Sequence, residues 1–355
     1  MANRLRNPIA VIIPAHNEAA IIHTTIKLLL HYLPRHQIYV VDDGSSDGTA
    51  SIAQKLVPHV ISHAKNMGKG AAINTAIKRW RLLQKYPYIM PLDADTTISP
   101  NFFPAILAFF DQDIHQNFAC ANGRVVAYQK NWITAYRMWE YEIGQTIHKA
   151  AQSILGGIVV SPGCATVYRS SVFRQFKFPT HSLAEDMDLT FTIHRRHLGK
   201  IGFISQAEVI TQDPSTLIDF IHQVDRWYTG LWQNICKHNL PWEGQMLDFE
   251  IALLATEALF SGFLYLCLIV LLPLSFSIDI RLFIIPLAID ICFFILPTLI
   301  YTSIRRRVKR MIIYLGHFYL LRTLSSLIFI KCFFKVMFDQ QPAFGWFSPR
   351  RYQLI

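Results

Sequence analysis

Two long apolar runs near the C-terminus constrain this chain of 355 residues more than any other feature. Residues 251–273 and 282–302 are each long enough to cross a bilayer, which takes about 20 apolar residues. A third run, 311–338, contains Arg322, Lys331 and Lys335, and a charge at mid-bilayer costs about 3 kcal/mol. The third run is therefore interpreted as a tilted span, a hairpin or an interfacial helix. The alternative is that these runs are core helices of a large soluble protein, which two spans of this purity make the weaker interpretation.

Basic residues gather beside these runs. The formal net charge is +10, and residues 251–355 hold eleven Lys and Arg against four Asp and Glu. Basic loops next to apolar spans usually face the cytoplasm, so the loop at 303–310 should do so. Two spans before this loop return the chain to its starting side. We therefore expect an integral protein of the cell (inner) membrane with its N-terminal domain in the cytoplasm. The bilayer, not nucleic acid, is the expected partner.

The first 212 residues alternate short apolar runs with helical patterns. Such runs predict buried strands, and helices are expected between them. The alternating order predicts a parallel α/β sheet. The expected strands cover 9–15, 38–41, 60–63, 88–92, 118–128, 165–169 and 201–210, and the expected helices include 47–56, 70–84, 132–153 and 185–197.

Acidic residues follow two of the predicted strands. Asp42 and Asp43 end one apolar run, and Asp93 and Asp95 end another. Ligands of open parallel sheets bind beyond the carboxyl ends of the strands. Carboxylates there suit Mg²⁺ or Mn²⁺ bound together with substrate phosphates. The ordinary interpretation of any single Asp here is a turn or a helix cap, whereas Asp93 and Asp95 taken together favour a functional site.

Two further segments have both a functional and an ordinary interpretation. Lys69 lies in a glycine-containing loop before a helix, where free backbone N–H groups could bind an anion, but an ordinary loop looks the same. Glu185 and Asp186 open a helical pattern, where acids are favoured by the helix dipole. A carboxylate there could also serve as a general base. Spacing alone favours the helix-dipole interpretation.

The stretch from 214 to 238 predicts an amphipathic helix shortly before the first apolar run. Gln223, Arg226 and Trp227 are spaced i, i+3 and i+4, so they share one side of that helix. Its Trp and Tyr content is typical of a membrane surface. The alternative is a core-facing or lipid-facing helix whose Arg226 extends its charge to the interface.

Together these segments resemble the inverting family 2 glycosyltransferases of the GT-A fold. The resemblance is to the membrane-bound branch, which includes cellulose, chitin, hyaluronan and poly-N-acetylglucosamine synthases. It runs in the family's order over about residues 8–235, and Ala184 stands where the family has Thr. The matching segments are Pro14-Ala-His-Asn-Glu18, Asp42-Asp43-Gly-Ser, the Gly-Lys69 loop, Asp93-Ala-Asp95, Ser161-Pro-Gly163, Ala184-Glu185-Asp186 and Gln223-Val-Asp-Arg226-Trp227.

The resemblance implies a fold in three parts. A GT-A, Rossmann-like mixed α/β sheet domain is expected over 1–212. An amphipathic interfacial helix with the QxxRW motif is expected over 213–240. An α-helical transmembrane region with a short cytoplasmic tail is expected over 241–355.

The resemblance also implies an activity and a role for each residue. A sugar would pass with inversion from a nucleotide sugar, a uridine diphosphate sugar above all, to a glycan or lipid-linked acceptor, with Mg²⁺ or Mn²⁺. The alternatives are transfer of one sugar to a carrier such as polyprenyl phosphate, or a non-catalytic subunit; an accessory membrane subunit is a further candidate partner. The implied residues are Asp186 and Glu185 for catalysis, with Asp186 as base; Pro14, Ala15, Asn17, Glu18, Asp42, Asp43, Lys69, Asp93, Gln223 and Arg226 for the donor; Gly163 and Trp227 for the acceptor; and Asp93 and Asp95 for the metal.

Overall fold

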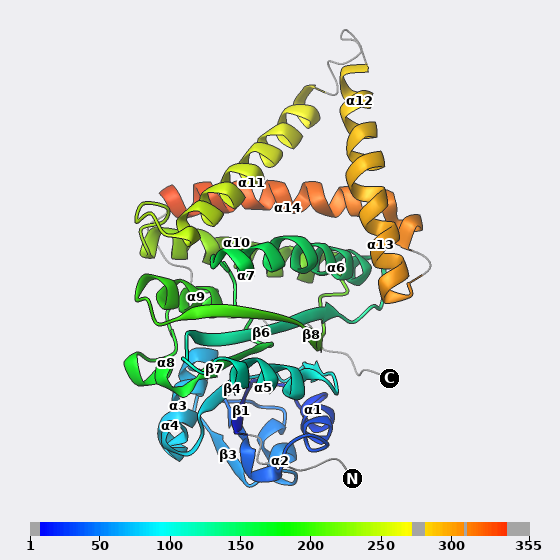
Figure 1. Cartoon of the computed structure of the whole chain (residues 1–355). Coiled ribbons are helices and arrows are strands. Elements are labelled where there is room, and N and C mark those ends of the chain that lie inside the picture. Colours follow the sequence, from blue (N-terminus) through cyan, green and yellow to red (C-terminus); the bar gives the residue numbers. More distant parts are fainter. Residues whose placement is uncertain (1–7, 272–280, 309–310, 339–355) are drawn as a thin grey trace. The chain divides into compact units, whose positions relative to one another are not determined.

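The computed structural model describes residues 8–271, 281–308 and 311–338 (Figure 1). The chain divides into two compact units. The sheet unit comprises the residues up to Val126 together with Lys149–Gln212, and the helical unit comprises Ala127–His148 and the chain from Asp213. The predicted tail and the last two residues of the first apolar run lie outside the described residues.

Within the described residues, eight strands form one sheet in the order β3-β2-β1-β4-β7-β6-β8-β5. The first four strands are parallel and follow one another through helices, the connection that parallel neighbours need. β7 pairs antiparallel with both β4 and β6, and β5 pairs antiparallel with β8, so the sheet is mixed. The strands are β1 (Ile9–Ala15), β2 (Ile38–Asp42), β3 (His59–Ser62), β4 (Tyr88–Pro91), β5 (Thr97–Ile98), β6 (Phe118–Ala127), β7 (Thr166–Arg169) and β8 (Lys200–Thr211).

Helices bury the sheet and define its core. Every residue of β1 is buried, as expected for a strand covered on both faces. Ile12 of β1 and Val41 of β2 join Ile73 of α3 and Leu189 of α9 in one apolar cluster. The helices of this unit are α1 (Ile22–Leu29), α2 (Thr49–Gln54), α3 (Lys69–Trp80), α4 (Leu82–Lys85), α5 (Phe102–Gln112), α7 (Ala150–Leu155), α8 (Ser170–Gln175) and α9 (Glu185–Arg195).

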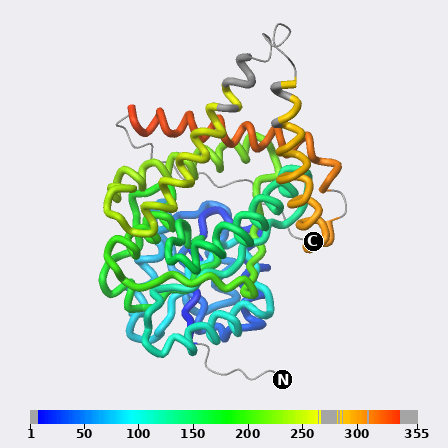
Figure 2. Tube along the Cα trace, turned by 45° about the horizontal axis from the view of Figure 1, so that its top comes forward, coloured from blue at the N-terminus to red at the C-terminus, as the bar shows by residue number. Residues whose placement is uncertain are grey.

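The helical unit is built around two long helices, α10 (Leu217–Lys237) and α14 (Leu315–Phe338), which lie side by side (Figures 1 and 2). Phe329 of α14 contacts the rings of Tyr228 and Trp232 of α10. The Thr216 hydroxyl accepts from the Asp219 N–H and caps the start of α10. The helices of this unit are α6 (Trp132–Ile143), α10 (Leu217–Lys237), α11 (Met246–Leu271), α12 (Arg281–Ile289), α13 (Leu296–Arg306) and α14 (Leu315–Phe338).

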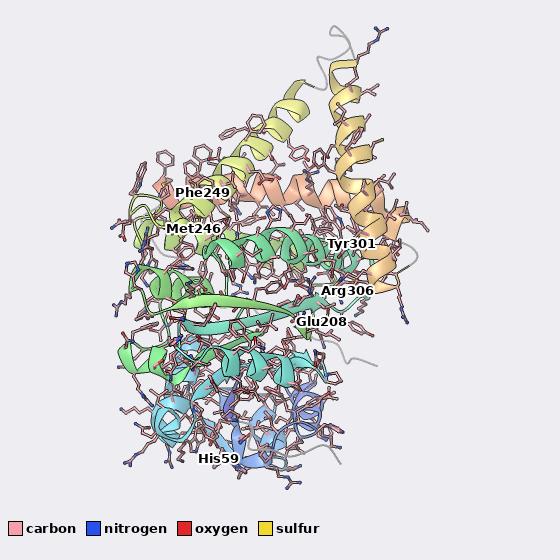
Figure 3. The ribbon with its side chains drawn as sticks, in the orientation of Figure 1. His59, Glu208, Met246, Phe249, Tyr301 and Arg306 are labelled. Carbon is pink, nitrogen blue, oxygen red and sulfur yellow. The ribbon has the colours of Figure 1, made fainter. Side chains whose placement is uncertain are left out.

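In the part of the chain that the structure describes, one helix, Leu287–Arg306, is long and apolar enough to cross a membrane. Only 17% of its most apolar window is buried, and Phe293 and Phe294 are exposed. It overlaps the second predicted span, 282–302, and follows without a break from the start of α12 at Arg281. α11, which carries the first predicted span, also exposes apolar side chains, among them Phe260. Figure 3 labels Met246 and Phe249 at the start of α11, and Tyr301 and Arg306 near the end of α13.

The charged residues of the third apolar run form ion pairs inside the helical unit. Lys331 Nζ lies 2.5 Å from an Asp225 carboxylate oxygen, and Lys335 Nζ lies 3.6 Å from the other. Arg322 Nη1 lies 2.7 Å from Asp290 Oδ2. These pairs offset the charges that made a plain span costly.

Candidate active site

A buried lysine stands at the centre of the predicted site. Lys69 is the first residue of α3, and its Nζ lies 2.6 Å from Asp93 Oδ1 and 3.5 Å from Glu185 Oε1. Burial alone would lower the pKa of Lys69, but the nearby Asp93, Glu185 and Asp186 carboxylates raise it above its usual range. Lys69 is therefore a permanent cation shared by three acids.

The predicted base lies in the first turn of α9, beside this lysine. Asp186 Oδ2 accepts a hydrogen bond of 3.2 Å from the Gly163 backbone N–H, and Oδ1 accepts one of 2.8 Å from the Met187 N–H. A Cβ added to Gly163 would lie 2.7 Å from Lys69 Nζ. The lysine approaches this backbone so closely that a larger residue would displace it. The structure thus brings Lys69, Asp93, Gly163, Glu185 and Asp186 together.

The second acid of the Asp-x-Asp pair, Asp95, lines a small pocket. The chain turns after β4, where the Thr96 N–H donates to the Asp93 carbonyl. Asp95 is buried, and the Thr96 hydroxyl donates to its Oδ1 over 3.2 Å. The pocket is lined by Ala20, Ile21, Thr24, Thr25, Asp95, Thr97 and Gln212.

Asp43 has a role that the sequence did not reveal. Its carboxylate accepts from the Met67 N–H at 2.9 Å and the Gly68 N–H at 2.7 Å, and it lies 2.7 Å from His63 Nδ1. Asp43 therefore shapes the loop that presents Lys69. Only the Gly-Lys spacing hinted at this loop, and nothing in the sequence linked it to Asp43. Asp42 accepts from the Ser45 N–H over 3.3 Å and is also buried.

The turn after β1 is joined to the loop after β2. Pro14 and Ala15 end β1, and Asn17 follows with φ of 57°. The Asn17 N–H donates to Ser45 Oγ over 2.9 Å, and the Glu18 N–H donates to Thr49 Oγ1 over 2.9 Å. Because β1 and β2 are parallel neighbours, their carboxyl ends meet at one edge of the sheet. The donor residues predicted on these two strands therefore lie side by side.

The QxxRW residues lie in the other unit, on α10. Gln223 Oε1 accepts a 3.0 Å hydrogen bond from Nη2 of Arg137, a residue of α6. The same guanidinium lies 4.7 Å from the centre of the Trp227 ring. Arg226 is half-buried on the same helix. Within the helical unit, Arg137 thus joins Gln223 and Trp227.

Comparison with known proteins shows which family the first part of the chain matches. Residues 10–176 match the family described as Glycosyl transferase family 2. The chain carries a family 2 glycosyltransferase domain. Hyaluronan synthase from Streptococcus pyogenes is 27% identical over 240 residues, which are 62% of this chain and 56% of that protein. Chitin synthase from Meloidogyne artiellia is 22% identical over 229 residues, 58% of this chain and 12% of that protein.

A solved structure shares the fold. A mannosyltransferase from Pyrobaculum calidifontis, in complex with GDP-Man and Mn²⁺, superposes with a TM-score of 0.59. It is 16% identical, and the match covers 94% of this chain and 88% of that chain. The GT-A-like, Rossmann-like mixed sheet that the resemblance implied is therefore confirmed, with a helical region after it. The family and the synthase relatives indicate a glycosyltransferase enzyme, although the chain spans less than two thirds of these relatives' length.

The residues of this family 2 domain fit a metal shared with its substrate. Across residues 8–271, 281–308 and 311–338, no three His, Cys, Asp or Glu side chains lie close enough together to hold an ion. Mg²⁺ is commonly held by one or two carboxylates, with substrate phosphates completing its shell. Asp95 and Asp93 supply hard oxygen atoms of that kind, so the donor set fits an ion that arrives with a diphosphate.

Proposed function

We propose that this family 2 glycosyltransferase moves a sugar, with inversion, from a uridine diphosphate sugar to a growing glycan at the membrane. The observation that supports this most directly is the cluster around Lys69. It joins the Gly-Lys loop, the Asp-x-Asp turn and the start of α9, and its Nζ lies 2.6 Å from Asp93. In this proposal Asp42 and Asp43 lie on the side of the nucleoside, and Asp93 and Lys69 on the side of the diphosphate.

Asp186 is the base of this mechanism. The Gly163 and Met187 N–H groups hold its carboxylate in one orientation, ready to accept a proton from the acceptor hydroxyl. That hydroxyl attacks the anomeric carbon as the bond to the diphosphate breaks, and one displacement inverts the configuration. Arg226 offsets the charge that builds on the leaving group, and Trp227 offers an apolar face to an acceptor ring.

The proposal includes a divalent cation. Asp95 and Asp93 would hold Mg²⁺ or Mn²⁺ against the donor diphosphate, where the ion supplies Lewis-acid stabilisation of the leaving group. The Mn²⁺ in the complex of the mannosyltransferase from Pyrobaculum calidifontis supports a divalent metal in this fold.

We also propose that the enzyme works at the cytoplasmic face of the cell (inner) membrane. The apolar helix Leu287–Arg306 and the basic residues at its end support this location. The hyaluronan and chitin synthase relatives favour a glycan as the acceptor. A single transfer to a lipid carrier remains the competing function, and an accessory membrane subunit remains a candidate partner.

A donor screen on the full-length protein tests the function. The protein is incubated with Mn²⁺ or Mg²⁺ and a panel of uridine diphosphate sugars, with GDP-mannose included, and the released nucleotide diphosphate is measured. We expect release from a uridine diphosphate sugar and a ladder of radiolabelled glycan. Release from GDP-mannose alone would contradict the assigned donor, and one lipid-linked product would contradict glycan extension. No release from any donor would support a non-catalytic subunit.

The Asp186→Asn substitution tests the base. Because the amide cannot accept the proton, transfer should fall by at least about a hundredfold, the lower range for general-base catalysis. Binding of uridine diphosphate, measured by calorimetry, should stay within about threefold, since the amide is similar in size. Asp111→Asn, on the exposed face of α5, is the control and should leave both unchanged. Equal loss of transfer and nucleotide binding would argue against a base at Asp186.

A further inference from the structure

Three residues on one side of α10 contact the same side chain, Arg137 of α6. Phe220, Gln223 and Trp227 are spaced i, i+3 and i+7, so they lie on the same side of the helix. Arg137 reaches all three of them. Its guanidinium carbon lies 4.4 Å from the Phe220 ring centre and 4.7 Å from that of Trp227, and its Nη2 donates to Gln223 Oε1 over 3.0 Å.

Arg137 is among the most deeply buried side chains of the protein, with 2% of its surface exposed. Burying a guanidinium costs several kcal/mol unless its charge is paired and its N–H groups are bonded. Glu140 supplies the counter-charge, with Oε2 at 2.5 Å from Nη1. The N–H groups at the edge of the guanidinium form hydrogen bonds, and aromatic rings pack against its planar faces. A planar group can do both at once, whereas the ammonium of a lysine cannot.

This arrangement has a consequence for the proposed chemistry. Gln223 and Trp227 are the residues to which we assign donor and acceptor contacts, and both are long side chains with several rotamers. Arg137 removes that freedom before any substrate arrives, because moving either side chain would break a contact to a buried charge. Pre-organised groups avoid this ordering cost during the reaction, and a displacement of about 1 Å can cost about a hundredfold in rate.

We propose that Arg137 is a positioning residue for the QxxRW motif, one that fixes the conformations of Gln223 and Trp227 for substrate binding and transfer. This inference rests on the proposed function of those two residues. The competing explanation is that Arg137 only stabilises the packing of α6 against α10. The two explanations differ in what a charge-conserving substitution does to activity and to the environment of Trp227.

The first test is the kinetics of the full-length Arg137→Lys enzyme. We expect kcat/KM for transfer to fall by about 10- to 100-fold, because the charge remains but the planar contacts do not. Binding of uridine diphosphate should weaken by no more than about threefold, because Gln223 is only one of the assigned donor residues and Asp42, Asp93 and Lys69, which belong to the other unit, are untouched. Arg196→Lys is the matched control, because Arg196 is an exposed arginine over the Phe176 ring, and it should keep wild-type kinetics.

The second test does not depend on activity. The protein contains seven Trp and can be labelled with 5-fluorotryptophan. Trp227→Phe assigns the fluorine resonance of Trp227. We expect Arg137→Lys to shift that resonance, because it removes the guanidinium from the ring face, and we expect Arg196→Lys to leave it in place.

The outcomes separate this inference from the proposed function. A kcat/KM within twofold of wild type, or an unshifted Trp227 resonance, overturns the positioning role. If the lysine variant lowers the melting temperature strongly, Phe220→Leu replaces it as the test, since it removes one ring face and keeps the Gln223 hydrogen bond. Phe220 is fully buried, so this variant should also lower the melting temperature, but by less than Arg137→Lys, because the buried charge of Arg137 keeps its partners Glu140 and Gln223. It should lower kcat/KM several-fold at a temperature where the protein stays folded, and unchanged kcat/KM overturns the inference. A wild-type protein that transfers no sugar overturns the proposed function, while the fluorine shift still decides whether Arg137 orders Trp227.

Discussion

Lys69 makes an acidic site compatible with a folded chain. Asp93 precedes Glu185 and Asp186 by more than 90 residues in the sequence, yet all three lie near the Lys69 amine. Without a cation these carboxylates would repel one another in a partly buried place. The sequence predicted each of these residues, but it could not predict that one lysine would pair with both Asp93 and Glu185. Those pairs exist only after the loop before α3 meets the start of α9.

Lys69→Met tests this account. The substitution keeps the length of the side chain and removes its charge, so two partly buried acids lose their shared partner. Breaking a buried ion pair costs about 3–5 kcal/mol, and the partial exposure of Asp93 reduces this to about 2–3 kcal/mol. The free energy of unfolding, measured by chemical denaturation, should fall by that amount. Lys65→Met, at an exposed position in the same loop, should change it by less than about 0.5 kcal/mol. Equal effects would contradict the central role of Lys69.

Among the elements, the buried strands were the most predictable from sequence. β1 has the predicted bounds, Ile9–Ala15; β2 and β4 differ from prediction by one residue at one end, and β3 is shifted by one residue at both ends. These strands are covered on both faces, so they appear as unbroken apolar runs. β5 was not predicted, because two residues carry no periodicity and Thr97–Ile98 becomes a strand only by pairing with β8.

Other elements depended on contacts that the local sequence does not encode. The alternation alone predicted a parallel sheet, whereas β7 enters antiparallel between β4 and β6. The helix expected over 132–153 is interrupted by a π-helical turn at Gly144–Lys149, which separates α6 from α7. In the site, the motifs gave the residues, while the supporting contacts of Asp43 and Arg137 join segments 24 and 86 residues apart and could not be predicted.

α9 carries a titratable group at the end opposite to Asp186. His194 Nε2 lies 2.9 Å from the Ile158 carbonyl, and burial lowers the pKa of His194 below its usual range. The unfolded chain therefore binds a proton near pH 6.5, before the folded chain does, and folding stability should fall as the pH drops below that value. The melting temperature should drop from pH 7.5 to pH 5.5, and it should drop less in His194→Gln, whose amide can still donate to the carbonyl. An equal drop in both proteins would contradict a buried neutral His194.

At the scale of the whole molecule, apolar side chains cover the outside of the Leu287–Arg306 helix. The sequence predicted an apolar run there but not which of its side chains would stay exposed. The side chains of Phe293 and Phe294 are exposed, and so is that of the neighbouring Cys292. In water this apolar surface would favour aggregation, whereas in a bilayer it would contact the apolar lipid chains.

Cysteine labelling tests this location. In inside-out vesicles, a variant that retains only Cys292 should resist a hydrophilic maleimide until the membrane is dissolved in denaturing detergent. A variant that retains only Cys236, which is exposed near the end of α10, should react in intact vesicles and serves as the control. Rapid labelling of Cys292 in intact vesicles would contradict a membrane-embedded helix.

The helix α6 contacts both the C-terminal end of the apolar helix and the QxxRW motif. Five residues after Arg137, the carboxylate of Glu142 lies 2.6 Å from both the Arg305 and Arg306 guanidinium groups at the end of α13. Trp139, between them in sequence, donates to Thr298 over 3.0 Å. A rotation of α6 about its axis would therefore move the Arg137 contacts to α10 and the Glu142 ion pairs to α13 together. The position of the basic end of α13 is thus coupled, through this one helix, to the side chains of Gln223 and Trp227.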